Sequence, residues 1–599
     1  MALKKVTRQA TAEHTTEINV RNQASTNQAS NREAEEKRRK ARTMAKQQQA
    51  AERISTASST LVSGIAESSA SQAELSTSMQ TIASGAEEAS GASQASLDAM
   101  NKISERLKLQ ATAAETSKET TRVLSELVGE TGSRINQLVE NISKASDQQN
   151  LSAQKMDELE SQAAKINETA EKNAATIGEL ISQIQRGAKE VGEGVKKAGE
   201  TAKSEVEKGI VVSQQLEQVG IDINEIYKGA NELLAGAGEM NKAAVDAQTG
   251  AENIAAASEE QSAACEQSLK SLEQQAQALS NSEQASQDLE TLAEELKTSS
   301  NIAKSAEDVA ASAEELSAAV EEINRSATEI MTAITQISKG AEQQASSAEQ
   351  AVAGITQIEK GVDLAANRAG FALEKGQMIT KTLAENKVSV DAMIKGITDA
   401  VEAGKVNLDK IVELEQVSRR IDKIVDSIAT VAIKTNMLAV NGAVEAARAG
   451  EYGKGFAVVS SDIQNLADDA AENADQIKDL VKAIQEQSII VRDDLAAIAE
   501  ASLQEVEKAK ASTAALVQME TDMLEVLKGN QQIKDGAAEV SSAVAECKKG
   551  MEQIATAAEE ASKAVGESSK AAQAQSEAAA ELASAVEEIA STADELQSA

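Results

Sequence analysis

Proline and tryptophan are absent from this chain of 599 residues, and it has only two phenylalanines and two tyrosines. Compact domains fill their cores with aromatic and branched aliphatic side chains, whereas the apolar residues here are largely alanine. A composition rich in Ala, Glu, Lys, Gln and Ser is typical of long helices packed as coiled coils. Because proline is absent, such helices can run without interruption. The sequence therefore excludes large globular cores and predicts an all-α chain.

Histidine and cysteine are nearly absent as well, which removes most catalytic and metal-binding chemistry. His14 is the only histidine, and Cys265 and Cys547 are the only cysteines. Catalytic triads need a histidine beside a nucleophile, and structural zinc sites need clustered cysteine or histidine ligands. The two cysteines lie far apart in the sequence, which indicates free thiols in a reducing compartment. We therefore expect no enzymatic activity, no metal and no cofactor.

Long apolar runs are also missing from the sequence. No stretch approaches the ~20 apolar residues that a membrane span needs, and no signal-peptide pattern opens the chain. The 96 acidic residues outnumber the 60 basic ones, and the net charge of −36 repels nucleic acid and anionic membranes. These observations predict a cytoplasmic protein that makes no contact with a membrane.

Residues 1–53 differ from the rest of the chain. They contain twelve Lys or Arg and six Glu, with a dense basic run from Lys37 to Lys46. The segment before that run is polar and has no apolar periodicity, so we predict that this tail is largely disordered. Two alternatives are a solvated helix start and a tail that binds nucleic acid or an acidic partner.

The remainder of the chain repeats itself. Glu205–Lys208 recurs as Glu505–Lys508, an offset of 300, whereas Lys155–Glu160 matches Lys410–Glu415 at an offset of 255. The two offsets differ by 45 residues, so the first copy lacks 45 residues that the second retains. We therefore divide the chain after the tail into a first coiled-coil unit, 54–300, and a second unit, 301–599.

The second unit has the pattern of a helical hairpin. Apolar residues recur in steps of three and four on both sides of residue 451, which is the heptad seam of a coiled coil. The seam positions are Ile421, Ile424, Ile428, Val431, Thr435, Leu438, Gly442 and Glu445, and then Val459, Ile463, Leu466, Ala470, Asn473, Ile477, Leu480 and Ile484. Between them Gly450, Gly453 and Gly455 supply the backbone freedom that a tight turn needs. Helices joined by so short a loop pack antiparallel.

The segment around this turn has a sequence that is typical of a known protein family. Residues 435–459 read TNMLAVNGAVEAARAGEYGKGFAVV. This run resembles the signalling tip of methyl-accepting chemotaxis proteins, and the resemblance extends from about Ile421 to Ile484, with the heptad pattern covering 300–599. The resemblance implies an elongated antiparallel coiled-coil hairpin that forms a four-helix bundle as a homodimer, and trimers of such dimers.

The resemblance also implies partners and site residues. The partners are a CheA-type histidine kinase and a CheW-type coupling protein, with a receptor methyltransferase and methylesterase. The matched trimer-contact positions are Ile433, Met437, Val440, Asn441, Glu445 and Arg448. The matched kinase and coupling-protein positions are Glu451, Lys454 and Val458. From the residues alone, Glu445 and Arg448 lie on one helical face, where they form either an ordinary intrahelical ion pair or a contact to a second bundle.

The sequence departs from the family pattern at four positions of the tip. Ile433 stands where the family usually has phenylalanine, Val440 replaces leucine, Gly442 replaces alanine and Lys454 replaces arginine. Glycine within a helix costs roughly 1 kcal/mol relative to alanine. The departures concern trimer and kinase contacts, so they put the array geometry of the family in doubt more than its fold.

Candidate methylation sites follow the family pattern of two small residues, two spacers, a Glu or Gln pair, two spacers and two small residues. Within the second unit, full or partial matches are centred on Glu314–Glu315, Gln343–Gln344, Glu559–Glu560 and Glu587–Glu588. The first unit contains further matches at Glu87–Glu88 and Glu259–Glu260. Esterification of a carboxylate removes one negative charge and relaxes repulsion between neighbouring helices. An alanine- and glutamate-rich chain also produces about one such match by composition alone.

Function and architecture remain open between alternatives at this point. The leading hypothesis is a cytoplasmic chemoreceptor that controls a histidine kinase and adapts by glutamate methylation. The alternatives are a structural or scaffold coiled coil of receptor ancestry and a nucleic-acid-binding regulator acting through the basic tail. We favour a first unit that reverses near Lys172–Asn173 as a hairpin without a tip. A continuous rod is the alternative.

Overall fold

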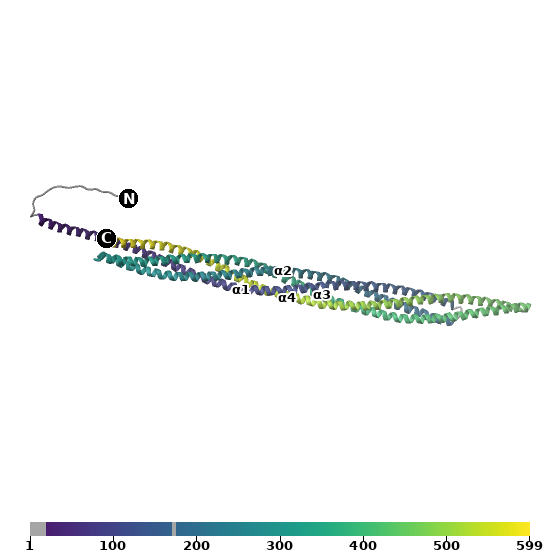
Figure 1. Cartoon of the computed structure of the whole chain (residues 1–599). Helices are drawn as coiled ribbons and strands as arrows, with labels where there is room; N and C mark the ends of the chain where they lie inside the picture. The colour runs from purple at the N-terminus through teal and green to yellow at the C-terminus, as the bar shows by residue number, and fades with distance from the viewer. Residues whose placement is uncertain (1–19, 171–174, 599) are drawn as a thin grey trace, which may run out of the picture. The chain divides into compact units, whose positions relative to one another are not determined.

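The structure, a computed structural model, describes residues 20–170 and 175–598, and the secondary structure in these ranges is helical throughout (Figure 1). The elements are α1 (Val20–Ala170), α2 (Ala175–Thr298), α3 (Ile302–Arg448), the short 3-10 helix η1 (Gly450–Gly453) and α4 (Lys454–Gln597). Asn301 caps α3, because its side-chain oxygen accepts a hydrogen bond from the Lys304 N–H at 3.4 Å. The predicted all-α, coiled-coil class is confirmed.

The chain divides into two compact units, and each contains a segment of all four helices. The first compact unit comprises 1–105, 240–360 and 540–599, and the second compact unit comprises 106–239 and 361–539. These compact units differ from the two sequence repeats, 54–300 and 301–599. Each helix therefore passes from one unit into the other. The units are described separately below.

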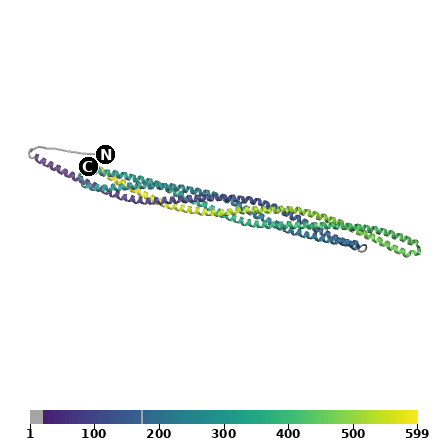
Figure 2. The ribbon, with the colours of Figure 1, turned by 90° about the horizontal axis from the view of Figure 1, so that it is seen from below.

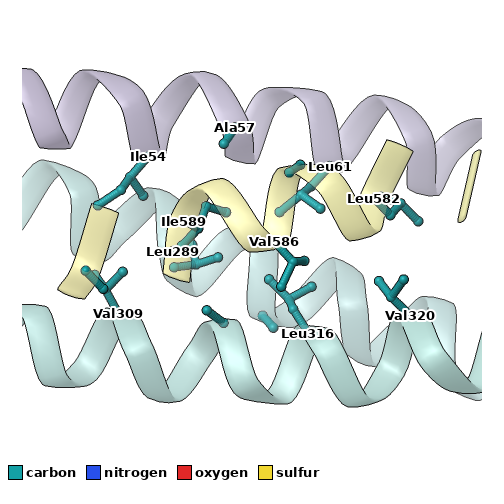
Figure 3. Close-up of a cluster of buried hydrophobic side chains, with 14 of the residues drawn as sticks. Ile54, Ala57, Leu61, Leu289, Val309, Leu316, Val320, Leu582, Val586 and Ile589 are labelled. Atoms are coloured by element: carbon teal, nitrogen blue, oxygen red, sulfur yellow. The ribbon is translucent and has the colours of Figure 1, made fainter. Parts of the chain in front are cut away.

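In the first compact unit, the core is a four-helix bundle. Ile54 of α1, Leu289 of α2, Val309 of α3 and Ile589 of α4 belong to one buried cluster (Figure 3). The Ser58 Oγ donates to the Ser286 carbonyl at 2.9 Å and so joins α1 to α2. Gln261 of α2 donates to the Ile337 carbonyl of α3 at 3.1 Å, and Gln575 of α4 donates to the Ser68 carbonyl of α1 at 3.2 Å. Neighbouring helices in this bundle run antiparallel.

The second compact unit has the same arrangement of four helices. Ser146 of α1 donates to the Gly199 carbonyl of α2 at 3.1 Å. Lys375 of α3 binds Asp222 of α2 at 2.9 Å, and Asn141 of α1 donates to Glu505 of α4 at 2.9 Å. These pairs again join neighbours that run in opposite directions. Buried side chains from all four helices form the two main clusters of this unit.

One chain therefore supplies all four helices of the bundle in each unit. The sequence analysis assigned these four helices to a homodimer. The internal repeat explains the difference. Because the α1–α2 hairpin has the heptads of the α3–α4 hairpin, it packs beside it where a second chain's hairpin was expected.

The contacts between α1 and α2 agree with a first hairpin and exclude a continuous rod. Ser93 of α1 donates to the Ala251 carbonyl of α2 at 2.5 Å, and Ser146 reaches Gly199. As the position in α1 advances, its partner in α2 moves back by a similar number of residues. The predicted reversal at Lys172–Asn173 itself lies outside the described residues.

From Val20 onward, where α1 begins, the structure shows a helix instead of the preferred prediction of disorder, and it agrees with the alternative of a solvated helix start. The segment lacks an apolar stripe, but Ala, Glu, Lys, Arg and Gln all favour helix. An ion pair one turn apart, Glu33 with Lys37 at 3.4 Å, also supports the helix. The first buried side chain on α1 among the described ones is that of Gln47, which donates to the Ser299 carbonyl at 2.9 Å. Residues 1–19 lie outside the described part of the chain.

Candidate functional site

The turn between α3 and α4 is built on two of the three predicted glycines. Gly450 has a φ of 60°, which is the left-handed region that glycine adopts without strain. Gly453 is buried, and a Cβ there would lie 2.0 Å from the Ala446 carbonyl oxygen. Gly455 lies in the first turn of α4, and a Cβ there would meet nothing within 4 Å. Gly450 and Gly453 are therefore required by the turn, whereas Gly455 is not.

Next to the turn, α3 and α4 contact each other through small side chains. The buried residues recur every seven positions on both helices. They are Ala432, Ala439 and Ala446 on α3, and Ser460, Ala467 and Ala474 on α4. Two polar contacts cross between the helices, Asn436 to Asp468 and Lys478 to Asp426, both at 2.6 Å. The Asp426 carboxylate also raises the pKa of Lys478 by hydrogen bonding.

Gly442, one of the departures from the family pattern, has a structural reason. A Cβ at this position would lie 2.9 Å from the Ser460 Oγ. Glycine therefore allows α3 to approach α4 closely at this level of the hairpin. An alanine would require the Ser460 side chain to move, and that side chain is buried.

The predicted trimer-contact residues are all exposed, and most of them share one face of α3. Ile433, Met437 and Val440 follow one another in steps of four and three, and all three are exposed. Val444 continues this stripe and is also exposed, although the sequence analysis did not include it. The step of four after Val440 is the signal that identifies it. Asn441 and Arg448 border this outward face.

Glu445 lies to one side of that face. It follows Leu438 by seven residues, so it belongs to the seam rather than to the outward stripe. Its Oε1 accepts a hydrogen bond from Arg448 Nη1 at 3.1 Å, and both side chains are exposed. This is the ordinary intrahelical ion pair that the sequence analysis held as one alternative. A solvated pair of this kind contributes little to stability.

The predicted kinase-contact residues also lie at the surface. Glu451 and Lys454 form an ion pair at 2.7 Å across the start of α4, and Val458 is exposed one turn later. Tyr452 and Phe456 are exposed beside them. The sequence analysis counted the few aromatic residues of the chain but gave none of them a role at the turn. The end of the hairpin thus presents apolar, aromatic and charged side chains together.

The candidate methylation residues lie in the first compact unit, which comprises 1–105, 240–360 and 540–599, and all but one are exposed. The exposed ones are Glu314, Glu315, Gln343, Glu559, Glu560, Glu587 and Glu588. Glu588 accepts a hydrogen bond from the Arg53 Nε of α1 at 3.4 Å, and Arg53 also reaches Glu595 at 3.1 Å. Esterification of Glu588 would therefore weaken a contact between α1 and α4.

Gln344 is the exception among these candidates. Its side chain is buried and donates to the Ser258 Oγ of α2 at 2.8 Å. A modifying enzyme needs access to the side-chain carbonyl carbon, so this placement argues against Gln344 as a site. The heptad pattern contained the signal, because Gln344 follows the buried Ile337 by seven residues.

Other chemistry has little support in the described residues. Cys265 and Cys547 are buried free thiols, and burial raises the pKa of each to about 12. In residues 20–170 and 175–598, His, Cys, Asp and Glu side chains form no group of three that is suited to a metal ion. Within the same ranges no helix has an apolar stretch long enough to cross a bilayer.

Comparison with known proteins identifies the hairpin. Residues 398–513 match the family model of the methyl-accepting chemotaxis protein (MCP) signalling domain. The chain carries an MCP signalling domain. The match begins in α3, includes η1 and ends in α4, so this domain contains the exposed tip described above.

Several curated proteins are similar to part of the chain. The biofilm dispersion protein BdlA of Pseudomonas aeruginosa is 35% identical over 158 residues, which are 26% of this chain and 37% of BdlA. McpP, a methyl-accepting chemotaxis protein of Pseudomonas putida, is 41% identical over 99 residues, or 16% of this chain and 18% of McpP. McpC of Bacillus subtilis is 36% identical over 111 residues, 17% of each chain. The chain thus spans little more than a third, at most, of these relatives.

Proposed function

We propose that the chain is a cytoplasmic chemoreceptor signalling protein that controls a CheA-type histidine kinase together with a CheW-type coupling protein. The observation that supports this most is the MCP signalling domain match at 398–513, which surrounds the turn at Gly450–Gly453. The chain itself would catalyse nothing. Its output would be a change in the packing or dynamics of the bundle that reaches the tip.

In this proposal the kinase and the coupling protein bind near Glu451, Lys454 and Val458. These side chains are exposed at the end of the hairpin. The hairpin ends of neighbouring bundles associate through the outward face of α3, which carries Ile433, Met437 and Val440. Glu445 and Arg448 then exchange their intrahelical pairing for charge-assisted hydrogen bonds to another tip.

A kinase assay tests this proposal. Replacing both members of the pair, Glu445→Ala with Arg448→Ala, should abolish control of kinase autophosphorylation in a mixture with the coupling protein. Helicity should not change, because an exposed ion pair adds at most ~1 kcal/mol. The matched control is Glu402→Ala with Lys405→Ala, another exposed pair on α3, separated by 3.2 Å. Unchanged kinase control in the tip variant would remove the assignment of this contact.

We further propose that a receptor methyltransferase and methylesterase adjust the output by reversible modification. The substrates would be the exposed candidates Glu314, Glu315, Gln343, Glu559, Glu560, Glu587 and Glu588, with Gln343 deamidated first. Each ester removes one charge from a chain whose net charge is −36. Reduced repulsion would tighten the bundle. At Glu588 the ester would also weaken the contact with Arg53.

Peptide mass spectrometry tests the modification. Incubation of the chain with a receptor methyltransferase should add esters within residues 310–350 or 555–592. Gln343 and Gln344 carry amides, so the assay uses a variant with Gln343→Glu and Gln344→Glu. Position 344 then serves as an internal control, because its buried side chain should stay unmodified in the folded protein whereas position 343 is exposed. Esters found only outside these two segments, or none at all, would defeat the proposed sites.

The domain assignment completes the proposal. Residues 301–599 form the signalling hairpin, and residues 54–300 form a receptor-like unit without a tip. We assign this first unit a role as spacer or input module for the hairpin that it packs against.

A further inference from the structure

In the first compact unit, α1 runs on past the turn that joins α2 to α3 (Figure 1 and Figure 2). That turn lies between Thr298, where α2 ends, and Ile302, where α3 begins. Gln47 of α1 lies at its level, because it donates to the Ser299 carbonyl at 2.9 Å. The side chains of residues 32–46 are all exposed except for the half-buried Thr43. We call residues 32–46 the basic extension.

The basic extension has the opposite charge to the rest of the chain. Residues 37–46 contain six basic residues and no acidic one, whereas the whole chain has a net charge of −36. The six are Lys37, Arg38, Arg39, Lys40, Arg42 and Lys46. Lys37 pairs with Glu33 at 3.4 Å, and the other five form no ion pair with any described side chain. Their charges are therefore available to an anionic partner.

The acidic bundle does not prevent such a partner from approaching. Lys40 precedes Gln47 by seven residues, about 10 Å along the helix, and Arg38 precedes it by about 14 Å. At physiological ionic strength, interactions between exposed charges are largely screened beyond about 8 Å. The repulsion of nucleic acid that the net charge predicts therefore does not extend to this segment.

The arrangement of side chains around the helix fits a groove rather than a flat surface. Ala41 and Ala45 lie one turn apart and form a face of small side chains. By the same helical spacing, basic side chains flank this alanine face on both sides. They are Lys37 and Lys40 on one flank and Arg38 and Arg42 on the other. A partner that surrounds the helix can reach both flanks at once, whereas a plane reaches only one.

The major groove of B-form DNA has this shape. It is about 12 Å wide and admits an α-helix, with phosphates along both walls. Continuous basic helices that extend from a coiled coil enter this groove in other DNA-binding proteins. In duplex RNA the major groove is deep and too narrow for such an approach.

A bilayer surface fits the basic extension less well. Helices that lie in the membrane interface bury an apolar face. Met44 is the only large apolar residue between Arg32 and Lys46. The observations therefore favour DNA over an anionic membrane as the partner.

We propose that the basic extension binds double-stranded DNA in the major groove. The alanine face lies toward the base edges, and the basic side chains on its two flanks bind phosphates of the two walls. Because phosphate contacts carry no sequence information, this binding is largely independent of base sequence. The function goes beyond the proposed kinase control and does not depend on it, since Glu451, Lys454 and Val458 take no part.

The first test measures binding of the full chain to a fluorescent DNA duplex by anisotropy at several salt concentrations. The duplex has mixed sequence and about 30 base pairs, which is three helical turns. We expect a dissociation constant on the order of 10 µM or lower at ~0.1 M salt, rising steeply with salt. Lys40→Gln with Arg42→Gln removes one charge from each flank. It should weaken binding roughly 10-fold or more and reduce the log–log salt slope by about 2.

The matched control is Lys548→Gln with Lys549→Gln, which removes two exposed charges from α4. It should leave DNA binding unchanged. Glutamine favours helix as lysine and arginine do, so circular dichroism should show equal helicity in both variants. Absence of DNA binding by the wild type, or equal losses in the two variants, would overturn the proposal.

The second test distinguishes the groove from a membrane surface without changing any charge. Ala41→Leu should weaken DNA binding about 10-fold, because the larger side chain holds the helix away from the groove floor. Thr43→Leu is the control, because position 43 lies on the side of the helix opposite the alanine face. Phosphatidylglycerol vesicles replace DNA in a parallel measurement. Tighter binding of the wild type to vesicles than to DNA, or no loss of DNA binding in Ala41→Leu, would overturn the placement in the groove.

Discussion

At the residue scale, the two glycines of the turn differ in what they allow. Gly450 supplies a positive φ, and Gly453 supplies space for the Ala446 carbonyl. We expect Gly453→Ala to destabilise the turn by about 1–3 kcal/mol, because its methyl group would overlap backbone atoms that have no freedom to move aside. Hydrogen exchange of the amides flanking the turn should accelerate, and kinase control should weaken with it.

Gly455→Ala is the control for this prediction. The position is helical and its Cβ would meet open space, so alanine should be neutral or should stabilise the helix by up to ~1 kcal/mol. Equal exchange rates in the two variants would show that close packing at Gly453 does not determine the turn.

Single side chains were the least predictable part of the site. The motif located the exposed Ile433, Met437 and Val440, because spacing along a helix defines a face. The motif did not show that Gln344 is buried and bonded to Ser258. The burial of Gln344 depends on which helix lies beside α3. A residue pattern within one helix does not identify that neighbour. Val444 was missed although its spacing marks it.

At the scale of the elements, heptads predicted the second hairpin and its turn correctly. Both depend on local pattern, and the arms of α3 and α4 follow it from Ile421 to Ile484. The helix from Val20 was only an alternative in the sequence analysis, because the absence of an apolar stripe favoured disorder. A stretch rich in Ala, Glu, Lys and Arg needs no buried face to be locally helical when it continues a longer helix.

The pairing of α1 with α2 gives a prediction of its own. The hydroxyl oxygens of Ser58 and Ser286 lie 3.1 Å apart. In a background without native cysteines, Ser58→Cys with Ser286→Cys should form a disulfide within one chain, since the two side chains already touch. Non-reducing electrophoresis with mass spectrometry distinguishes this product from a crosslink between chains.

The matched control moves one cysteine along α2. Ser258 is also buried on α2, but it lies 28 residues before Ser286, about 42 Å along the helix. Ser58→Cys with Ser258→Cys should therefore give no disulfide within the chain. Crosslinks only between two chains in the first variant would show that α1 and α2 of different copies pair instead.

At the scale of the whole molecule, the origin of the four helices determines how stability depends on concentration. If one chain supplies the bundle, unfolding is unimolecular and its midpoint temperature is independent of concentration. We expect this for the full chain. Thermal unfolding followed by circular dichroism at concentrations spanning two orders of magnitude measures it.

The opposite outcome has a clear signature. A bundle made by two chains would unfold at a higher temperature as the concentration rises. The homodimer inferred from the family resemblance would then supply the four helices after all.

The repeat in the sequence was visible without a structure. The first repeat could pair with the second repeat of its own chain or with a repeat of another chain. The entropy of loop closure and the competition between these two pairings decide the outcome, and the heptad pattern does not contain that information.

The first hairpin lacks 45 residues that the second retains, and two hairpins contributed by identical chains could not differ in this way. In a homodimer every deletion appears twice, so shortening one hairpin shortens its partner and removes both signalling ends. A chain that contains both halves can lose symmetry one half at a time. Each half is then free to acquire its own mutations, and a single gene can assign input to one hairpin while the other keeps the output motif.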